Sequence, residues 1–130
     1  LAMAGFPNLF MITGPQSPSV KTQMILGGQQ HTEWIADFLE HMRLNGFNRF
    51  DVEQQAEDDW VLHNNQIADS TLYPLANSWY VGANVPGKPR VFMPYVGGFD
   101  RYKRACDELA QNGYPGLQFS GRGQTVNAAD

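Results

Sequence analysis

The stretch from Tyr73 to Pro89 constrains the fold of this chain more than any other part of the sequence. Its turn-forming and helix-breaking residues exclude any long regular element there, and they are Pro74, Asn77, Gly82, Asn84, Pro86, Gly87 and Pro89. The same stretch contains the large apolar side chains of Trp79, Tyr80 and Val81. Long loops are usually functional or disordered, and large aromatic side chains are uncommon as mere filler. The sequence therefore predicts regular elements on both sides of a long functional loop.

Three helices are predicted outside this loop, and with a few short strands they define an α+β fold. The first runs from about Val20 to Leu44, and the second from a capping box at Asp51–Gln54 to about Ser70. The third covers roughly Phe99 to Gln111 and ends at Asn112-Gly113. Apolar residues recur at helical spacing most clearly in the first helix, at Trp34, Ile35, Phe38, Leu39 and Met42.

Other segments give less regular signals. Gly27-Gly28 lies within the first predicted helix, at a cost of roughly 1 kcal/mol per glycine relative to alanine. Either the helix starts later, near Gln30, or the backbone closely approaches a ligand or another strand at this point. The apolar runs Leu9–Ile12 and Val91–Met93 predict short strands. The tail after Phe119 is expected to fray.

Charge and cysteine content exclude several classes of partner. The 130 residues carry a net charge of −4, which is not the basic footprint of a protein that binds nucleic acid or an anionic membrane. No apolar run approaches the ~20 residues that span a bilayer. Cys106 is the single cysteine, so an intrachain disulfide is excluded and a reducing cytoplasm is the expected location.

The sequence also predicts that the chain is a piece of a longer protein. Leu1 stands where an initiator methionine is expected, and a strand-like run follows almost at once. Apolar strands such as Leu9–Ile12 usually lie in a parallel sheet that is covered on both faces, yet the chain offers few strands to pair with one. Because an exposed apolar face promotes association, we expect the isolated chain to self-associate.

No self-contained catalytic or metal site is evident in the sequence. His31, His41 and His63 have no metal-ligand spacing with one another or with Cys106, and no serine lies in a nucleophile elbow. The segment from Gly14 to Met24 is a Gly-Pro loop that leads into a helix. Because a helix N-terminus presents unpaired N–H groups and a partial positive charge, it suits an anionic ligand atom.

Several segments of the chain resemble a known enzyme family. Gly5–Ser19 (GFPNLFMITGPQSPS) resembles the run near the end of the flavin domain in Baeyer–Villiger monooxygenases. Asn77–Arg90 (NSWYVGANVPGKPR) resembles the mobile control loop of that family, and Thr71–Pro74 before it and Tyr95–Gly98 after it also match. The similarity extends over about residues 5 to 117, in the order and at the spacing of the family.

The resemblance implies a chemistry for the parent enzyme. FAD is reduced by NADPH, the reduced flavin captures O2 as a C4a-peroxide, and the peroxide converts a ketone into an ester or lactone. FAD and NADP(H) carry this chemistry, while the protein supplies position and electrostatics. The implied partners are the ketone, O2 and the N-terminal remainder of the enzyme, with neither nucleic acid nor a membrane among them.

The residue roles that the resemblance implies fall on two loops. Met24 aligns with the position whose backbone lies against the pyrimidine edge of the flavin; the alternatives are a plain core role, or donation by Gln23 or Thr22 instead. Trp79 aligns with the tryptophan that folds over NADP and donates its indole N–H to the ribose. The alternative for Trp79 is an anchor that pins the loop to the core. The variable loop that shapes the substrate pocket matches Ser19, Val20, Lys21 and Thr22.

Motifs that the family needs are missing from this sequence. It has no dinucleotide fingerprint for FAD or NADPH and no match to the segment with the active-site arginine, so no catalytic residue is assigned. We therefore expect residues 1–130 to be the C-terminal segment of the FAD-binding and helical region, including control loop 77–90. Inactive alone, this segment would complete the α/β fold of the parent, whose two dinucleotide-binding segments lie elsewhere. The alternatives are a non-catalytic interaction module of the same fold and another flavin monooxygenase, of the N-hydroxylating type.

Overall fold

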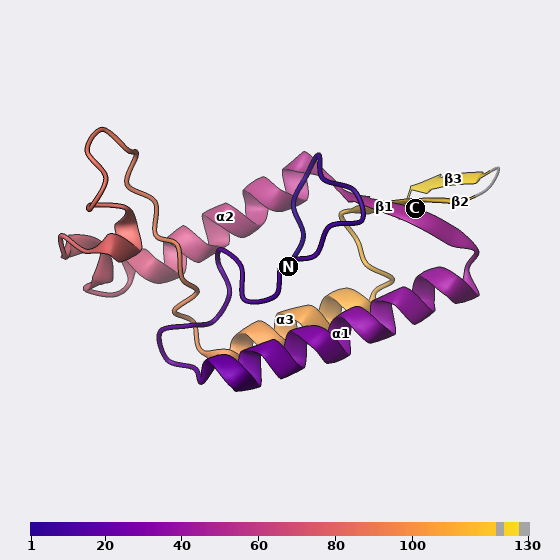
Figure 1. Ribbon diagram of the computed structural model, residues 1–130, viewed down its shortest axis with the longest axis horizontal. Coiled ribbons are helices and arrows are strands. Elements are labelled where there is room, and N and C mark those ends of the chain that lie inside the picture. The colour runs from indigo at the N-terminus through magenta and orange to yellow at the C-terminus, as the bar shows by residue number, and fades with distance from the viewer. Residues whose placement is uncertain (122–123, 128–130) are drawn as a thin grey trace.

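The computed structural model describes residues 1–121 and 124–127, which form helices and one small sheet. The elements are α1 (Met24–Leu44), β1 (Phe47–Val52), α2 (Gln54–Asp69), the 3-10 helices η1 (Tyr73–Leu75) and η2 (Trp79–Val81), α3 (Phe99–Gln111), β2 (Leu117–Gly121) and β3 (Gln124–Asn127). The sheet lies at one end of the helices, and the irregular segment that holds η1 and η2 lies at the other (Figure 1). The three α-helices in the described ranges confirm the predicted α+β class. None of the helices described is long and apolar enough to cross a membrane.

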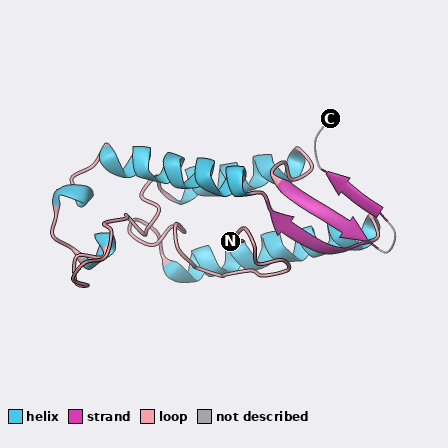
Figure 2. Cartoon of the chain, turned by 90° about the horizontal axis from the view of Figure 1, so that it is seen from above, coloured by secondary structure: helices cyan, strands magenta, loops and turns pink. Residues whose placement is uncertain are grey.

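The sheet is antiparallel with strand order β1-β2-β3, and it joins segments that are far apart in the sequence. Phe50 pairs with Phe119, and Val52 pairs with Leu117. Directly opposed aromatic and branched side chains stabilise such a pair of strands. Figure 2 shows the three strands side by side at one end of the helices. The sheet thus ties the region around the start of α2 to the chain that follows α3.

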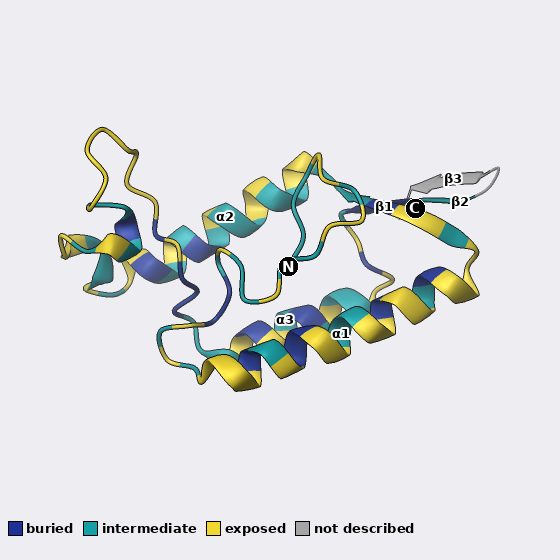
Figure 3. Ribbon diagram, in the orientation of Figure 1, coloured by how far each residue is buried: buried dark blue, intermediate teal, exposed yellow. Residues whose placement is uncertain are grey.

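The main core lies between α1 and the sheet. Phe38 of α1 is fully buried, and its ring meets the ring of Phe50 edge-on with centroids 4.9 Å apart. Phe119 of β2 closes this cluster from the sheet side. Burial of Phe38 and Met42, one helical turn apart, confirms part of the predicted stripe, whereas Leu39 is 51% exposed. Figure 3 shows the alternation of buried and exposed positions along α1.

A second cluster lies at the other end, where the irregular segment packs on α2. Its buried residues are Ala68, Val81, Phe92 and Val96. A third cluster, formed by Tyr95, Tyr102 and Cys106, connects this segment to α3. Tyr102 and Cys106 are the buried residues of α3, and the predicted bounds of this helix are confirmed. The chain therefore has separate apolar clusters at its sheet end and at its loop end.

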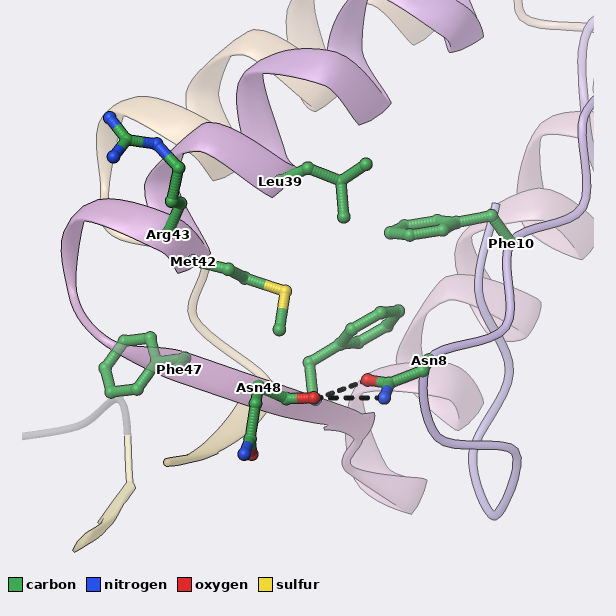
Figure 4. Close-up of a pocket in the computed structure, with 8 residues that line it drawn as sticks. Asn8, Phe10, Leu39, Met42, Arg43, Phe47 and Asn48 are labelled. Carbon is green, nitrogen blue, oxygen red and sulfur yellow. Dashed lines mark hydrogen bonds between the residues drawn. The ribbon is translucent and has the colours of Figure 1, made fainter. Parts of the chain in front are cut away.

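The N-terminal segment crosses between α1 and α2 without forming a strand. Asn8, at a left-handed φ of 59°, holds it against β1. Its Oδ1 accepts the N–H of Phe50 at 2.9 Å, and its Nδ2 donates to the carbonyl of Asn48 at 3.2 Å (Figure 4). Thr13 is also left-handed, at φ 54°. The predicted strand Leu9–Ile12 is therefore wrong, because left-handed residues flank the apolar run and a side-chain amide replaces strand pairing.

Two helices begin at residues other than those predicted. α2 follows Glu53 and has no side-chain cap, so the predicted capping box is wrong. Asp51 lies in β1 instead, where its carboxylate pairs with Arg49 at 3.3 Å. α1 begins at Met24, not at about Val20, because residues 20–22 form a bend.

The remaining differences concern glycines and strands. Gly27 and Gly28 both lie within α1, so the helix does not start later. A Cβ at Gly27 would make only an ordinary contact, at 3.8 Å, with the carbonyl oxygen of Pro18, and a Cβ at Gly28 would meet no described atom within 4 Å beyond the neighbouring backbone of α1. Val91–Met93 belongs to no ladder, so that strand prediction is wrong. The stretch after Phe119 pairs as β2 and β3 instead of fraying; residues 122–123 and 128–130 lie outside the described residues.

Candidate functional site

The two loops singled out by the sequence meet at the end of the molecule opposite the sheet. Backbone groups of the Gly14–Pro18 loop bond to the segment that follows the long loop. The N–H of Gln16 donates to the carbonyl of Met93 at 2.6 Å, and the N–H of Tyr95 donates to the carbonyl of Ser17 at 3.0 Å. Pro18 and Tyr95 also form an isolated parallel bridge. The structure therefore brings together two segments that are far apart in the sequence.

The first loop ends at the N-terminus of α1. Gln23 occupies the cap position without a side-chain hydrogen bond, and no acidic residue lies in the first turn. The N–H of Gly27 donates to the carbonyl of Gln23 at 3.1 Å, so the amides from Met24 to Leu26 precede the first helical bond. Met24 is 47% exposed at this helix start. This helix end offers N–H donors and a partial positive charge to an external acceptor.

The four residues before the helix form an irregular, partly exposed edge. Ser19 and Lys21 are exposed, whereas Val20 and Thr22 are half-buried. The hydroxyl of Thr22 is buried without a hydrogen-bond partner among the described residues. Val20 packs against the apolar cluster at the loop end. All of Ser19, Val20, Lys21 and Thr22 therefore lie on one short edge beside Met24.

The second loop presents Trp79 on its outer side. Trp79 opens η2 and is 66% exposed, with its ring 4.1 Å from the ring of Tyr80, measured between centroids. Val81 is buried, and Tyr80 packs against the same apolar cluster. Tyr80 and Val81 therefore make the packing contacts that the anchor alternative had assigned to Trp79. Most of the indole surface stays open to a further contact.

The ends of the second loop are clasped together. The guanidinium of Arg90 donates to the side-chain oxygen of Asn77 at 2.8 Å. Within the loop, the hydroxyl of Ser78 accepts the N–H of Tyr80 at 3.2 Å, and Gly82 ends η2 at a left-handed φ of 71°. Residues 84–91 are exposed. The two ends of the loop are thus joined by a hydrogen bond, its inner turn is anchored, and its outer part is exposed to solvent.

Two buried polar residues support these loops, and sequence reasoning missed both. His31 of α1 is fully buried, and its Nδ1 accepts the N–H of Thr13 at 3.0 Å. Burial, followed by the positive charge of the chain's amino terminus, lowers the pKa of His31 to about 4. Asn64 of α2 is also fully buried, and its side chain donates to the carbonyl of Phe92 at 3.1 Å. A polar residue on the inner stripe of a helix was the available signal for each.

Two hollows lie in the described part of the molecule, and one of them borders the first loop through Pro15 and Gln16. One of about 400 Å³ lies between α1 and β1, and its walls include Phe10, Leu39 and Asn48 (Figure 4). Another, of about 430 Å³, lies among the three helices, and its walls include Trp34 and Trp60. Neither hollow is lined by the predicted site residues. Within the described ranges, no group of three histidine, cysteine or acidic residues could hold a metal ion.

Comparison with curated proteins gives extended matches. The chain is 40% identical over 121 residues to an acetone monooxygenase (methyl acetate-forming) of Gordonia sp. strain TY-5, covering 92% of this chain and 23% of that protein. It is 39% identical over 118 residues to a Baeyer–Villiger monooxygenase of Pseudooceanicola batsensis, covering 86% and 20%. A phenazine N-monooxygenase of Lysobacter antibioticus is 31% identical over 123 residues, covering 90% and 21%. No protein-family model matches the chain.

Solved structures agree with these matches. Cyclohexanone monooxygenase from Rhodococcus sp. Phi1 bound to NADP+ superposes with a TM-score of 0.86 at 31% identity, over 92% of this chain and 22% of that one. The OTEMO complex with FAD and NADP gives a TM-score of 0.80 at 30% identity, over 92% and 22%. These matches define the fold as that of a segment of flavin monooxygenases.

The relatives named above include a Baeyer–Villiger monooxygenase and an acetone monooxygenase. The chain is homologous to one segment of the Baeyer–Villiger monooxygenases, which confirms the resemblance found in the sequence. It spans about a fifth of the length of the curated relatives that it matches.

Proposed function

We propose that this chain is the C-terminal segment of an FAD- and NADPH-dependent Baeyer–Villiger monooxygenase, and that it contributes two adjoining loops to the cofactor and substrate site. The main support is the backbone pairing of the Gly14–Pro18 loop with the segment after the Asn77–Arg90 loop. Residues 77–90 are then the control loop, and the FAD- and NADP-binding Rossmann segments belong to the rest of the parent. Its activity is the oxidation of a ketone by O2 to an ester or lactone.

The proposed flavin contact is the N-terminus of α1. The backbone N–H of Met24, at an uncapped helix start without acidic neighbours, would donate to the pyrimidine edge of FAD. The helix dipole would stabilise negative charge there. The unpartnered hydroxyl of Thr22 beside it fits a polar ligand at this place. When bound, FAD reduced by NADPH supplies the oxygen-transfer chemistry.

The proposed nucleotide contact is Trp79. Its ring is 66% exposed on a turn that Tyr80 and Val81 anchor, so the indole is available to cover NADP and to donate its N–H to the ribose. The edge formed by Ser19, Val20, Lys21 and Thr22 would shape the substrate pocket. The chain by itself would be inactive, because it holds none of the residues assigned to the chemistry.

The same proposal also predicts the partners and the cellular location of the chain. Ile25, Leu72 and Leu75 are 79%, 80% and 82% exposed, and the N-terminal remainder of the enzyme would cover such apolar surface. A cytoplasmic location fits the single free thiol, at Cys106. The net charge of −4 favours neither nucleic acid nor an anionic membrane as a partner.

A second candidate is N-oxidation by the same kind of enzyme. It is favoured by the 31% identity to the phenazine N-monooxygenase. The two candidates share the cofactors and differ in the acceptor, which is a carbonyl carbon in one and a ring nitrogen in the other. Product analysis after incubation with a cyclic ketone or with an aromatic N-heterocycle separates them.

The test uses the complete enzyme that contains this chain. Trp79→Ala should raise the KM for NADPH about tenfold, which corresponds to the ~1.4 kcal/mol of one hydrogen bond and its packing. Trp79→Phe should lose a smaller part, because it removes only the N–H donor. Leu75→Ala, at another exposed apolar residue in the same irregular segment, is the control. The proposal fails if the unaltered enzyme binds no FAD or if Trp79→Ala leaves the KM for NADPH unchanged.

A further inference from the structure

Met93 lies between the two loops, and its own backbone groups join them. Its N–H donates to the carbonyl of Tyr80 at 3.0 Å, and its carbonyl accepts the N–H of Gln16 at 2.6 Å. One residue thus links η2, next to Trp79, to the loop that leads to Met24. The N–H and the C=O of Met93 belong to successive planar peptide groups that meet at its Cα, so the two hydrogen bonds are connected through a single residue.

The segment around Met93 is fixed to α2 by a hydrogen bond and by apolar packing. The side chain of Asn64 donates to the carbonyl of Phe92 at 3.1 Å, and both residues are buried. The ring of Phe92 packs with Val81 of η2 and with Ala68 of α2 in the apolar cluster at the loop end. Asn64 is therefore the polar contact that fixes the Phe92–Tyr95 segment to a rigid helix.

We propose that the Phe92–Tyr95 segment transmits displacements of the turn at Trp79 to the loop that leads into α1, and that Asn64 is the positioning residue that keeps this link aligned. The inference rests on the proposed function, since it couples the nucleotide contact to the flavin contact. Hydrogen bonds weaken steeply beyond ~3.5 Å. A shift of Tyr80 by about 1 Å must therefore either break its bond to Met93 or move Met93, and with it the acceptor of Gln16.

The alternative is that the hydrogen bonds of Met93 only fasten a static wall. The two alternatives predict different effects of NADP+ binding on the hydrogen bond donated by Gln16. If the Phe92–Tyr95 segment transmits displacements, NADP+ bound at Trp79 changes how often the hydrogen bond donated by Gln16 opens. The reason is that the coupling between two sites is a free energy that both sites share. A static wall leaves the amide of Gln16 unaffected by NADP+. Spatial continuity alone does not decide between them.

Hydrogen–deuterium exchange in the complete, FAD-loaded enzyme tests the proposal. With saturating NADP+, the amides of Gln16 and Met93 should exchange about tenfold more slowly than without it, a typical size for coupling between sites. In Asn64→Ala, the slowing at Met93 should persist in part, while the slowing at Gln16 should fall to less than about twofold. Asn65→Ala removes the same side chain from the next, half-exposed position of α2 and should retain the full effect.

The outcomes separate this inference from the proposed function. Loss of flavin absorbance or of NADP+ binding in the unaltered enzyme would overturn both. Normal cofactor binding with no NADP+ effect at Gln16 overturns the inference alone, and so does an equal effect at Gln16 in Asn64→Ala and in the unaltered enzyme. If Asn64→Ala does not fold, the exchange of Gln16 in the unaltered enzyme still decides, because a static wall gives no response there.

Discussion

Lowering the pH should loosen the loop that leads into α1, because His31 can support this loop only while it is neutral. Its Nδ1 accepts the N–H of Thr13 at 3.0 Å, and a protonated imidazole has no acceptor to offer. The side chain is fully buried against the ring of Tyr102, with the ring centroids 5.5 Å apart. An imidazolium there would lose its hydration as well as this hydrogen bond.

The size of the effect follows from the pKa. Burial lowers the pKa of His31 from its usual 6.5 to about 4, and the charge of the amino terminus adds to this. Because the pKa is lower in the folded chain, the unfolded chain takes up the proton first as the pH falls. Stability is therefore lost from about pH 6.5 down to about pH 4. The total loss is about 3 kcal/mol, since each tenfold change in proton affinity corresponds to about 1.4 kcal/mol.

Urea denaturation at several pH values between 7 and 4 measures this loss. His31→Gln keeps an acceptor for the N–H of Thr13 but does not titrate, so its free energy of unfolding should fall by about 3 kcal/mol less than that of the unaltered chain. His41→Gln, at a half-exposed position on the same helix, should behave like the unaltered chain. Parallel pH profiles for His31→Gln and the unaltered chain would refute the assignment of the acid sensitivity to this histidine.

Two further predictions concern packing and the exposed surface. Gly116→Ala should destabilise the chain by about 2–3 kcal/mol in urea, because the residue has φ +79° and its Cβ would lie 2.6 Å from the Cβ of Ala56. Gly113→Ala, at φ +75° with open space around it, should lose only about 1–2 kcal/mol from backbone strain, and equal losses would contradict the clash. The isolated chain should self-associate in light scattering, and Leu72→Lys with Leu75→Lys should reduce this, because both leucines are at least 80% exposed. A monodisperse monomer at high concentration would count against that prediction.

The helices were predictable from the sequence because their signals are local. The Asn112-Gly113 stop located the end of α3 correctly, and the end predicted for the first helix, at Leu44, is the observed end of α1. The start of α1 was misplaced because the bend at residues 20–22 carries no distinctive residue type. Propensity alone does not fix a helix start that lacks a capping side chain.

The strands were missed because their pairing is not local. β1 contains Asp51, which resembles a helix cap when the sequence is considered without β2. β2 lies some 65 residues further on, and only its presence makes the residues of β1 a strand. The alternation of Leu117 and Phe119 with polar residues was a usable signal. Leu9–Ile12 had the apolar content of a strand, but the left-handed Thr13 beside it is a conformation that a β-branched residue rarely adopts.

The two segments of the candidate site were predictable from the sequence, but the contact between them was not. The resemblance indicated Met24 and Trp79, and their roles stay predictions. The contacts that join the two segments involve the backbone of Gln16, Met93 and Tyr95, and backbone hydrogen bonds leave no mark in side-chain patterns. His31 and Asn64 carried a signal only as polar residues on helix stripes, which most often means a satisfied core residue.

The separation of the apolar clusters has a consequence for how such a chain can vary. The rings around Phe38 and Phe50 lie at the sheet end, whereas Val81 and Phe92 lie at the loop end. Substitutions far apart with no shared partners act almost additively on stability. Selection can therefore change residues at the loop end, where ligands are proposed to bind. The packing of the sheet end then offsets the stability that such substitutions lose. A library directed at the loop end should therefore retain folded members.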